Sequence, residues 1–159
     1  CGTHTPRLYS TMAGTSTAAT CHCGQVKLVV PAAPASVTSC NCTVCHAYGA
    51  LWAYYQDADV ALPAEGLTQA YCHGNRTTAF HRCSTCGCVT HFVGIERGPA
   101  GSLKGLMAIN ARLMERSVLQ SATVKRFDGL ESWTVLDTDF KWGYCPTSDV
   151  VTTKPRAGM

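Results

Sequence analysis

The sequence has few charged residues and no dense run of one charge sign. Only 14% of its 159 residues are Asp, Glu, Lys or Arg, and the formal net charge is +3. The 13 Lys and Arg residues are scattered along the chain, which gives little basic surface for the phosphate backbone of a nucleic acid. We therefore expect no nucleic-acid partner.

Long hydrophobic runs are missing as well. No stretch approaches the roughly 18 uninterrupted apolar residues that a membrane helix needs, and the N-terminal residues lack the apolar core of a signal peptide. We therefore expect no membrane partner, and a soluble cytoplasmic protein is the simplest interpretation. Because the chain starts at Cys1 and small residues follow Met12, residues 1–20 are expected to be an N-terminal extension.

What the sequence has in abundance is cysteine. Its 11 cysteines are an odd number, so they cannot all form internal disulfides. Disulfide frameworks spread cysteines through a chain, whereas here seven of them lie in short clusters at 21–23, 40–45 and 83–86. Such spacings are typical of metal sites. We predict metal-bound thiolates in a reducing compartment, with buried free thiols as the alternative.

The first and third clusters together offer four thiolates. Cys21, Cys23, Cys83 and Cys86 form two hooks, and a glycine follows the last cysteine of each. Glycine adopts positive φ at no steric cost, which lets backbone N–H groups point at the sulfurs. Four thiolates fill the tetrahedral shell of zinc, so this site is predicted to be structural and to contribute to folding.

The second cluster offers three thiolates, from Cys40, Cys42 and Cys45. Three protein ligands leave one position of a zinc ion open for water or substrate, as in catalytic sites. Thiolate ligands favour soft sulfur guests, so a thiol-bearing substrate is expected. The alternative is a second structural site, completed by a further side chain: His46, His22, His73 or Cys88.

The rest of the sequence predicts a mainly β domain. Short stretches with strand preference are separated by turn residues, and we expect antiparallel strands at 25–30, 36–39, 51–55, 67–72, 77–82, 88–93, 106–110, 124–127 and 133–136. Residues 111–121 have a helix-favouring composition but poor apolar spacing, so one short helix is expected there. The domain is expected to span residues 21–145, followed by a C-terminal tail at 146–159.

Six segments of this chain form a series of short motifs. They are Cys-His-Cys-Gly at 21–24, Cys-Asn-Cys-Thr-Val-Cys at 40–45 followed by Gly49, Tyr71, His-Arg-Cys-Ser-Thr-Cys-Gly at 81–87, Ile-Asn-Ala-Arg at 109–112 and Phe-Asp-Gly at 127–129. In order and spacing, over roughly residues 20–130, this series resembles the glutathione-dependent formaldehyde-activating enzyme and centromere protein V family.

The resemblance implies a β-tent fold of antiparallel sheets that binds two zinc ions. One ion would be structural, on the four-cysteine set, and the other would be exchangeable, on the three-cysteine set. For the namesake enzymes it also implies carbon–sulfur lyase-type chemistry, in which glutathione joins formaldehyde or is released from it. Fold and zinc binding transfer better than substrate does. We therefore expect a small-molecule thiol adduct, with glutathione as the candidate cosubstrate.

Three side chains are the main candidates for catalysis or substrate binding beside the open zinc position. His46 adjoins Cys45, and its ordinary pKa suits acid–base catalysis near neutral pH. Tyr48 is a second candidate for proton transfer, ahead of His91 and Glu96. Arg112 could bind a substrate carboxylate through two parallel hydrogen bonds. The alternatives are an exposed histidine on the metal hook, packing for the tyrosine and a structural ion pair for the arginine.

Two function classes compete for this sequence. The leading hypothesis is a zinc-dependent lyase that acts on a sulfur adduct of a small molecule. The rival is a non-catalytic zinc module whose surface binds a protein partner, as the centromere protein V branch of the resemblance allows. A thiol redox protein is disfavoured because the Cys-x-x-Cys pairs are committed to metal. The oligomeric state is left open, with a homodimer as one option.

Overall fold

The computed structural model describes residues 16–74, 76–95, 97–98, 101–102 and 105–141. Strands dominate the described part of the chain, and the helical segments are short. The strands are β1 (Thr17–Thr20), β2 (Lys27–Val30), β3 (Ser36–Cys40), β4 (Trp52–Gln56), β5 (Thr68–Cys72), β6 (Thr78–Cys83), β7 (Val89–Gly94), β8 (Arg97–Gly98), β9 (Gly101–Ser102), β10 (Leu106–Asn110), β11 (Thr123–Asp128) and β12 (Thr134–Lys141). The helices are α1 (Thr43–Tyr48) and α2 (Arg116–Leu119), with 3-10 turns η1 (Asp57–Asp59) and η2 (Ala111–Leu113). The prediction of a mainly β protein is confirmed.

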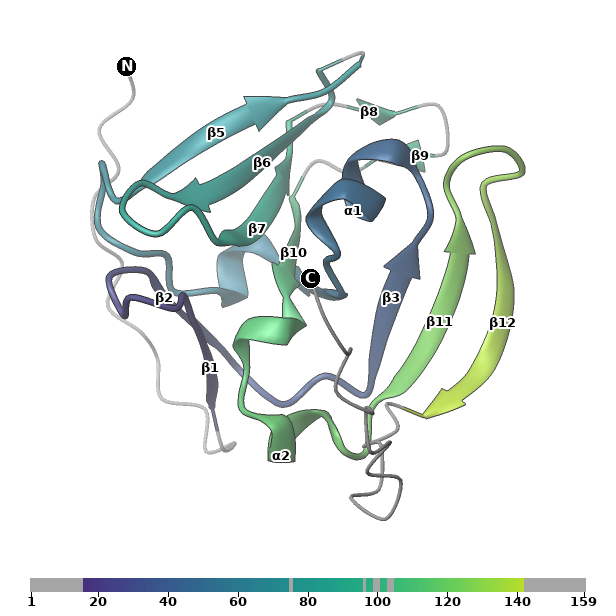
Figure 1. Ribbon diagram of the computed structural model, residues 1–159, viewed down its shortest axis with the longest axis horizontal. Helices are drawn as coiled ribbons and strands as arrows, with labels where there is room; N and C mark the ends of the chain where they lie inside the picture. The colour runs from purple at the N-terminus through teal and green to yellow at the C-terminus, as the bar shows by residue number, and fades with distance from the viewer. Residues whose placement is uncertain (1–15, 75, 96, 99–100, 103–104, 142–159) are drawn as a thin grey trace, which may run out of the picture.

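Eight of these strands form one sheet, in the order β12-β11-β3-β4-β10-β7-β6-β5. Its pairings are antiparallel except that of β3 with β11, which is parallel. Parallel neighbours need a long connection, and here the chain between β3 and β11 forms the middle and one edge of the sheet (Figure 1). The parallel pair therefore brings residues 36–40 beside residues 123–127.

Two clusters of buried side chains pack against opposite faces of the sheet, because successive side chains along a strand point to opposite faces. The larger cluster includes Ile109 together with Ala19 of β1 and Leu28 and Val30 of β2, whereas Ala108, the neighbouring residue on β10, belongs to a smaller cluster. The smaller cluster contains the aromatic rings of Trp52, Phe80 and Phe92, and it also contains Cys45. The second cysteine set is thus built against this aromatic cluster.

The stacked imidazoles of His81 and His91 occupy neighbouring positions on β6 and β7. Their ring centroids are 4.4 Å apart with an interplanar angle of 10°, and His91 is only 2% exposed. The Nδ1 atoms share hydrogen bonds with Thr68 Oγ1 at 3.1 Å and with Thr90 Oγ1 at 2.9 Å, respectively. Burial, assisted by His81, lowers the pKa of His91 from 6.5 to about 3.

This pKa predicts that acid destabilises the fold through His91. The folded pKa is below the unfolded one, so this contribution to stability is complete above pH 6.5 and is lost as the pH falls towards 3. Between pH 7.5 and 5.5 the wild type should lose about 1.4 kcal/mol more unfolding free energy than the His91→Phe variant, measured by urea unfolding. Equal losses of unfolding free energy in the two proteins would contradict the prediction. Protonation of the metal ligands affects both proteins alike, so it cancels in the comparison.

The chain enters the fold earlier than the sequence suggested. Residues 1–20 were expected to be an extension, but β1 pairs with β2 in register from Thr17 to Thr20, and Ala19 is fully buried. An isolated bridge between Ala19 and Met114 adds to this packing. Ala19 is the residue of this strand that packs in the larger core cluster. Residues 1–15 and the whole of the expected tail, 146–159, lie outside the described residues.

Helical structure also differs from expectation. The single short helix predicted for residues 111–121 is divided into η2 and α2, because Met114 has extended backbone (φ −83°, ψ 160°). The Asn110 side chain accepts a hydrogen bond from the Arg112 N–H at 3.2 Å, which favours a short turn there. Conversely, α1 was not predicted. No helix in the described ranges is long and apolar enough to cross a membrane.

Candidate metal centre

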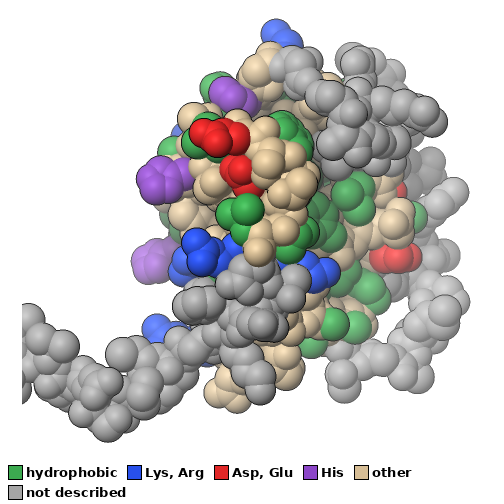
Figure 2. All heavy atoms as spheres, turned by 90° about the vertical axis from the view of Figure 1, so that its right-hand side faces the viewer, with side chains coloured by type: hydrophobic (Ala, Val, Ile, Leu, Met, Phe, Trp, Pro, Cys, Tyr) green, Lys and Arg blue, Asp and Glu red, His purple; other side chains and the backbone are tan. Residues whose placement is uncertain are grey.

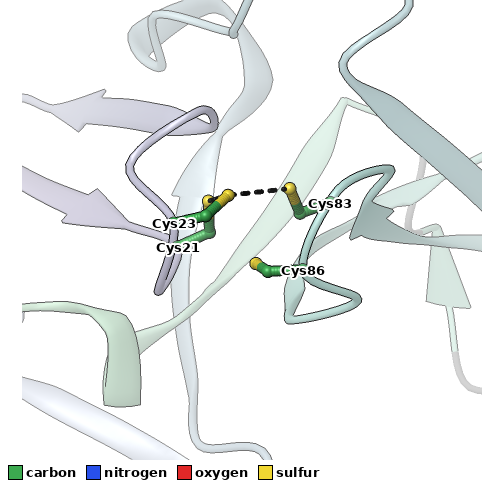
Figure 3. A group of neighbouring side chains, drawn as sticks. All are labelled: Cys21, Cys23, Cys83 and Cys86. Carbon is green, nitrogen blue, oxygen red and sulfur yellow. Dashed lines mark hydrogen bonds between the residues drawn. The ribbon is translucent and has the colours of Figure 1, made fainter.

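Four cysteines from two distant turns converge beside the larger core cluster. Cys21 and Cys23 lie in the turn between β1 and β2, while Cys83 ends β6 and Cys86 lies in the turn to β7. Figure 3 shows the two pairs facing each other with their sulfurs directed into the space between them. All four Sγ atoms lie within 4.8 Å of one another. The structure thus brings this predicted set together.

The spacing of these sulfurs fits a tetrahedral zinc ion. Zn–S bonds of about 2.3 Å place the sulfurs of a tetrahedral site about 3.8 Å apart. The Sγ atoms of Cys21 and Cys23 are 3.5 Å apart, and those of Cys23 and Cys83 are 3.7 Å apart (Figure 3). The cysteines are free thiols rather than disulfides. A four-thiolate zinc site is therefore compatible with both the chemistry and the geometry of the group.

Backbone N–H groups surround the same sulfurs. The Val26 N–H donates to Cys21 Sγ at 3.2 Å, and the N–H groups of Cys88 and Cys23 lower the pKa of Cys86 to about 5. The turns adopt this shape through Gly24 and Gly87, whose φ values are +81° and +73°. These donors favour thiolates, which are the form that binds metal.

The second group gathers around the start of α1. Cys40 ends β3, Cys42 caps the helix and Cys45 lies within it, so that α1 follows directly from the end of β3 in Figure 1. The three Sγ atoms lie within 4.8 Å of one another. Within the described ranges this group holds three cysteines and no fourth Cys, His, Asp or Glu ligand, so His22, His46, His73 and Cys88 do not complete it.

Hydrogen-bond donors distinguish the three sulfurs. The Trp52 indole N–H donates a hydrogen bond to Cys45 Sγ at 3.2 Å, and the Cys42 N–H donates one to Cys40 Sγ at 3.5 Å. The Cys45 thiol and the backbone N–H groups of Cys42 and Gly129 lower the pKa of Cys40 to about 6. Cys45, in contrast, has a raised pKa because its proton bonds to Cys40 and its sulfur is buried. One thiolate is thus already favoured in the group without metal.

The candidate catalytic side chains lie at different places in the fold. His46 is exposed on α1, one position beyond Cys45, which turns it about 100° around the helix axis from that ligand. Tyr48 is half-buried, packs edge-on against Phe80 at 5.8 Å and has a pKa raised by burial. Arg112 lies in η2 with an exposed side chain. Glu96 is outside the described residues.

A shallow hollow of about 270 Å³ lies beside α1. Its wall is formed by side chains of α1 and by residues at the end of β5, namely Thr43, Val44, Ala47, Tyr48, Tyr71 and His73. On α1, Thr43, Val44 and Ala47 point away from Cys45, whereas Tyr48, three positions after Cys45, lies on nearly the same side of the helix. Tyr48 also lines the hollow, and its proposed role at the thiolates stays a prediction.

Tyr54 lies on the strand predicted at 51–55 and was not among the predicted acid–base candidates. It lies two residues after Trp52, on the same face of β4, and its ring packs edge-on against Phe92 at 5.9 Å. Burial raises the pKa of its phenol, and Cys45, Cys40 and Cys42 add to the effect. The phenol is therefore within electrostatic reach of all three sulfurs, while the residue is 44% exposed.

Comparison with known proteins finds a structural similarity but no matching family. No family model matches this sequence, and no curated protein matches it. The crystal structure of a Rhodobacter sphaeroides protein, a Northeast Structural Genomics target, is similar to this chain with a TM-score of 0.53 and 26% sequence identity. The similarity covers 62% of this chain and 88% of the other.

Proposed function

We propose that the protein is a zinc-dependent, carbon–sulfur lyase-type enzyme that acts on a thiol adduct of a small molecule. We place it in the glutathione-dependent formaldehyde-activating enzyme and centromere protein V family on the motifs of its sequence. The observation that supports this function best is the convergence of Cys40, Cys42 and Cys45 within 4.8 Å. Three protein ligands leave a tetrahedral zinc ion one position for substrate.

Zinc held by Cys40, Cys42 and Cys45 would supply a position that favours the deprotonated form of a soft thiol. The addition needs no net proton, because the thiol gives up one proton as it ionises and the carbonyl oxygen takes up one, so a side chain of the protein has to accept the first and donate the second. When the sulfur electron pair attacks the carbonyl carbon, the C–S bond forms as the π bond of the carbonyl breaks and its oxygen takes up the proton; in reverse, the hydroxyl loses that proton as the carbonyl forms again, the C–S bond breaks and the sulfur regains a proton. Tyr54 is our candidate for this proton donor and acceptor, ahead of His46 and Tyr48. Glutathione is the proposed thiol, and Arg112 the proposed partner of its carboxylate.

The direct test follows free thiol released from a panel of adducts. Zinc-loaded protein is incubated with hydroxymethyl and larger hydroxyalkyl adducts of glutathione and of simpler thiols, and thiol is trapped with a chromogenic reagent. Release above the spontaneous rate is expected for at least one adduct, and it should stop in protein stripped of metal. No acceleration across the panel by protein containing two zinc ions would refute the lyase proposal.

Tyr54→Phe should lower kcat/KM for the best adduct about 100-fold, the usual scale of a general acid–base contribution. The metal content should be unchanged because the phenol is not a ligand. The matched control is Tyr55→Phe, which removes the hydroxyl that donates to the Ala32 carbonyl at 3.0 Å on the other face of β4. Equal rates in the Tyr54→Phe variant and the wild type would exclude this role.

One surface feature favours the rival function, a protein-interaction module. The β11–β12 turn and the following edge strand expose four large apolar side chains, each more than half exposed: Leu130, Trp133, Val135 and Leu136. Figure 2 shows the corresponding side of the molecule, where hydrophobic side chains are interspersed with a narrow band of Lys and Arg. Exposed apolar patches often mark interaction sites. Under this proposal both metal groups would stabilise the fold only.

A further inference from the structure

The turn that follows β11 lies directly against the three-cysteine group. Because β3 and β11 are parallel neighbours, with Cys40 opposite Phe127, both strands deliver the chain to the same end of the sheet. The Asn41 N–H donates to the Phe127 carbonyl at 3.2 Å. The residue between the ligands Cys40 and Cys42 is thus fixed to β11.

The Asp128 side chain stabilises this turn and also joins it to Asn41, which lies between Cys40 and Cys42. Its carboxylate accepts hydrogen bonds from Leu130 N–H (3.3 Å), Glu131 N–H (3.2 Å) and Ser132 N–H (2.9 Å), and from the Ser132 hydroxyl (2.7 Å). It also accepts from Asn41 Nδ2 at 2.9 Å, while Asn41 Oδ1 accepts from the Leu130 N–H at 3.1 Å. Asp128 itself is buried, at 8% exposure, whereas its partners Asn41, Leu130, Glu131 and Ser132 lie at exposed positions.

Gly129 is the point of closest approach. A Cβ built on this residue would lie 2.6 Å from Cys40 Sγ and 3.2 Å from Cys42 Cβ. Separations below 3.0 Å are not tolerated by real Cβ atoms, so any other residue would displace the sulfur or the turn. The absence of a side chain lets the Gly129 backbone lie directly against Cys40 and Cys42.

We propose that the Asp128–Ser132 turn is a positioning element of the three-cysteine site, in which Gly129 gives Cys40 its place and Asp128 holds the turn against Asn41. Groups that orient metal ligands commonly change metal affinity 10- to 100-fold when they are removed. The inference rests on metal binding by the three-cysteine group, which is part of the proposed function, and it does not depend on lyase chemistry.

The test compares metal affinity at the two groups of the full-length protein. Cobalt replaces zinc, its thiolate charge-transfer absorption is followed during titration, and competition with a chelator gives the Kd of each ion. Gly129→Ala should weaken the second ion at least 10-fold and leave the four-cysteine ion unchanged. The control is Gly74→Ala in the turn between β5 and β6, where a methyl group meets nothing within 4 Å; it introduces some backbone strain at φ +55° but should bind both ions as the wild type does.

A second pair of variants tests the Asp128–Asn41 contact without adding bulk. Asp128→Asn should weaken the second ion, and adding Asn41→Asp, which restores a carboxylate opposite an amide, should recover part of the affinity. Unchanged affinity of the second ion in Gly129→Ala overturns the inference; should that variant not fold, unchanged affinity in Asp128→Asn overturns it. A wild type that binds only one ion would overturn the proposed function as well, so the two failures are distinguishable.

Discussion

Cys83→Ser is expected to unfold the protein. Cys83 is fully buried and its Sγ lies 3.7 Å from that of Cys23, so it joins the β1–β2 turn to β6. Structural zinc contributes about 10–16 kcal/mol of apparent binding free energy in small zinc domains, whereas a whole domain is stable by only about 5–15 kcal/mol. Loss of this ligand should therefore abolish the cooperative thermal transition and the β signal in circular dichroism.

Cys72→Ser is the matched control for this experiment. Cys72 ends β5, is half-buried and lies outside both metal groups, so the same atom is changed without loss of a ligand. Its melting temperature should stay within a few degrees of the wild-type value. Prolonged exposure of the wild type to a strong chelator should reproduce the Cys83→Ser result. A folded Cys83→Ser protein with wild-type stability would instead identify the four cysteines as buried free thiols.

The parts of the fold that could be predicted from the sequence are those that neighbouring residues determine. Strands follow from short β-prone stretches between turn residues, and the metal groups follow from cysteines two or three positions apart. The glycines after Cys23 and Cys86 were informative for the same reason, because positive φ at these positions is a local requirement. Each of these features depends on a few neighbouring residues only.

The features that escaped prediction depend on contacts between distant segments. The α1 sequence, Thr-Val-Cys-His-Ala-Tyr, contains two β-branched residues, which disfavour a helix. The helix nevertheless forms where Cys45 packs in the aromatic cluster, and Gly49 ends it at φ +57°. Tertiary packing determines whether such a short helix forms, so no local sequence pattern predicted this one.

The surroundings of the three-cysteine group were equally hidden. Asn41 and Asp128 are 87 positions apart, and only the parallel pairing of β3 with β11 places them in contact. The strand that carries Tyr54 was predicted, but the face that Tyr54 occupies became clear only from the Trp52–Cys45 hydrogen bond. Sequence spacing identified the ligands, whereas the groups that orient them required the sheet order.

Cys42→Ala is expected to remove one metal ion and leave the protein folded. Cys42 is half-buried at the start of α1, and the four-cysteine group and the larger core cluster do not include it. Two remaining thiolates should hold zinc too weakly to retain it at micromolar protein, so metal analysis should give one ion per chain instead of two. Adduct turnover should fall to the spontaneous rate, while the melting temperature changes by a few degrees at most.

Cys72→Ala, the same substitution outside both groups, should retain two ions and full activity. Unfolding of Cys42→Ala would assign a structural role to the second ion and favour the interaction module, because an exchangeable site must tolerate the loss of its metal.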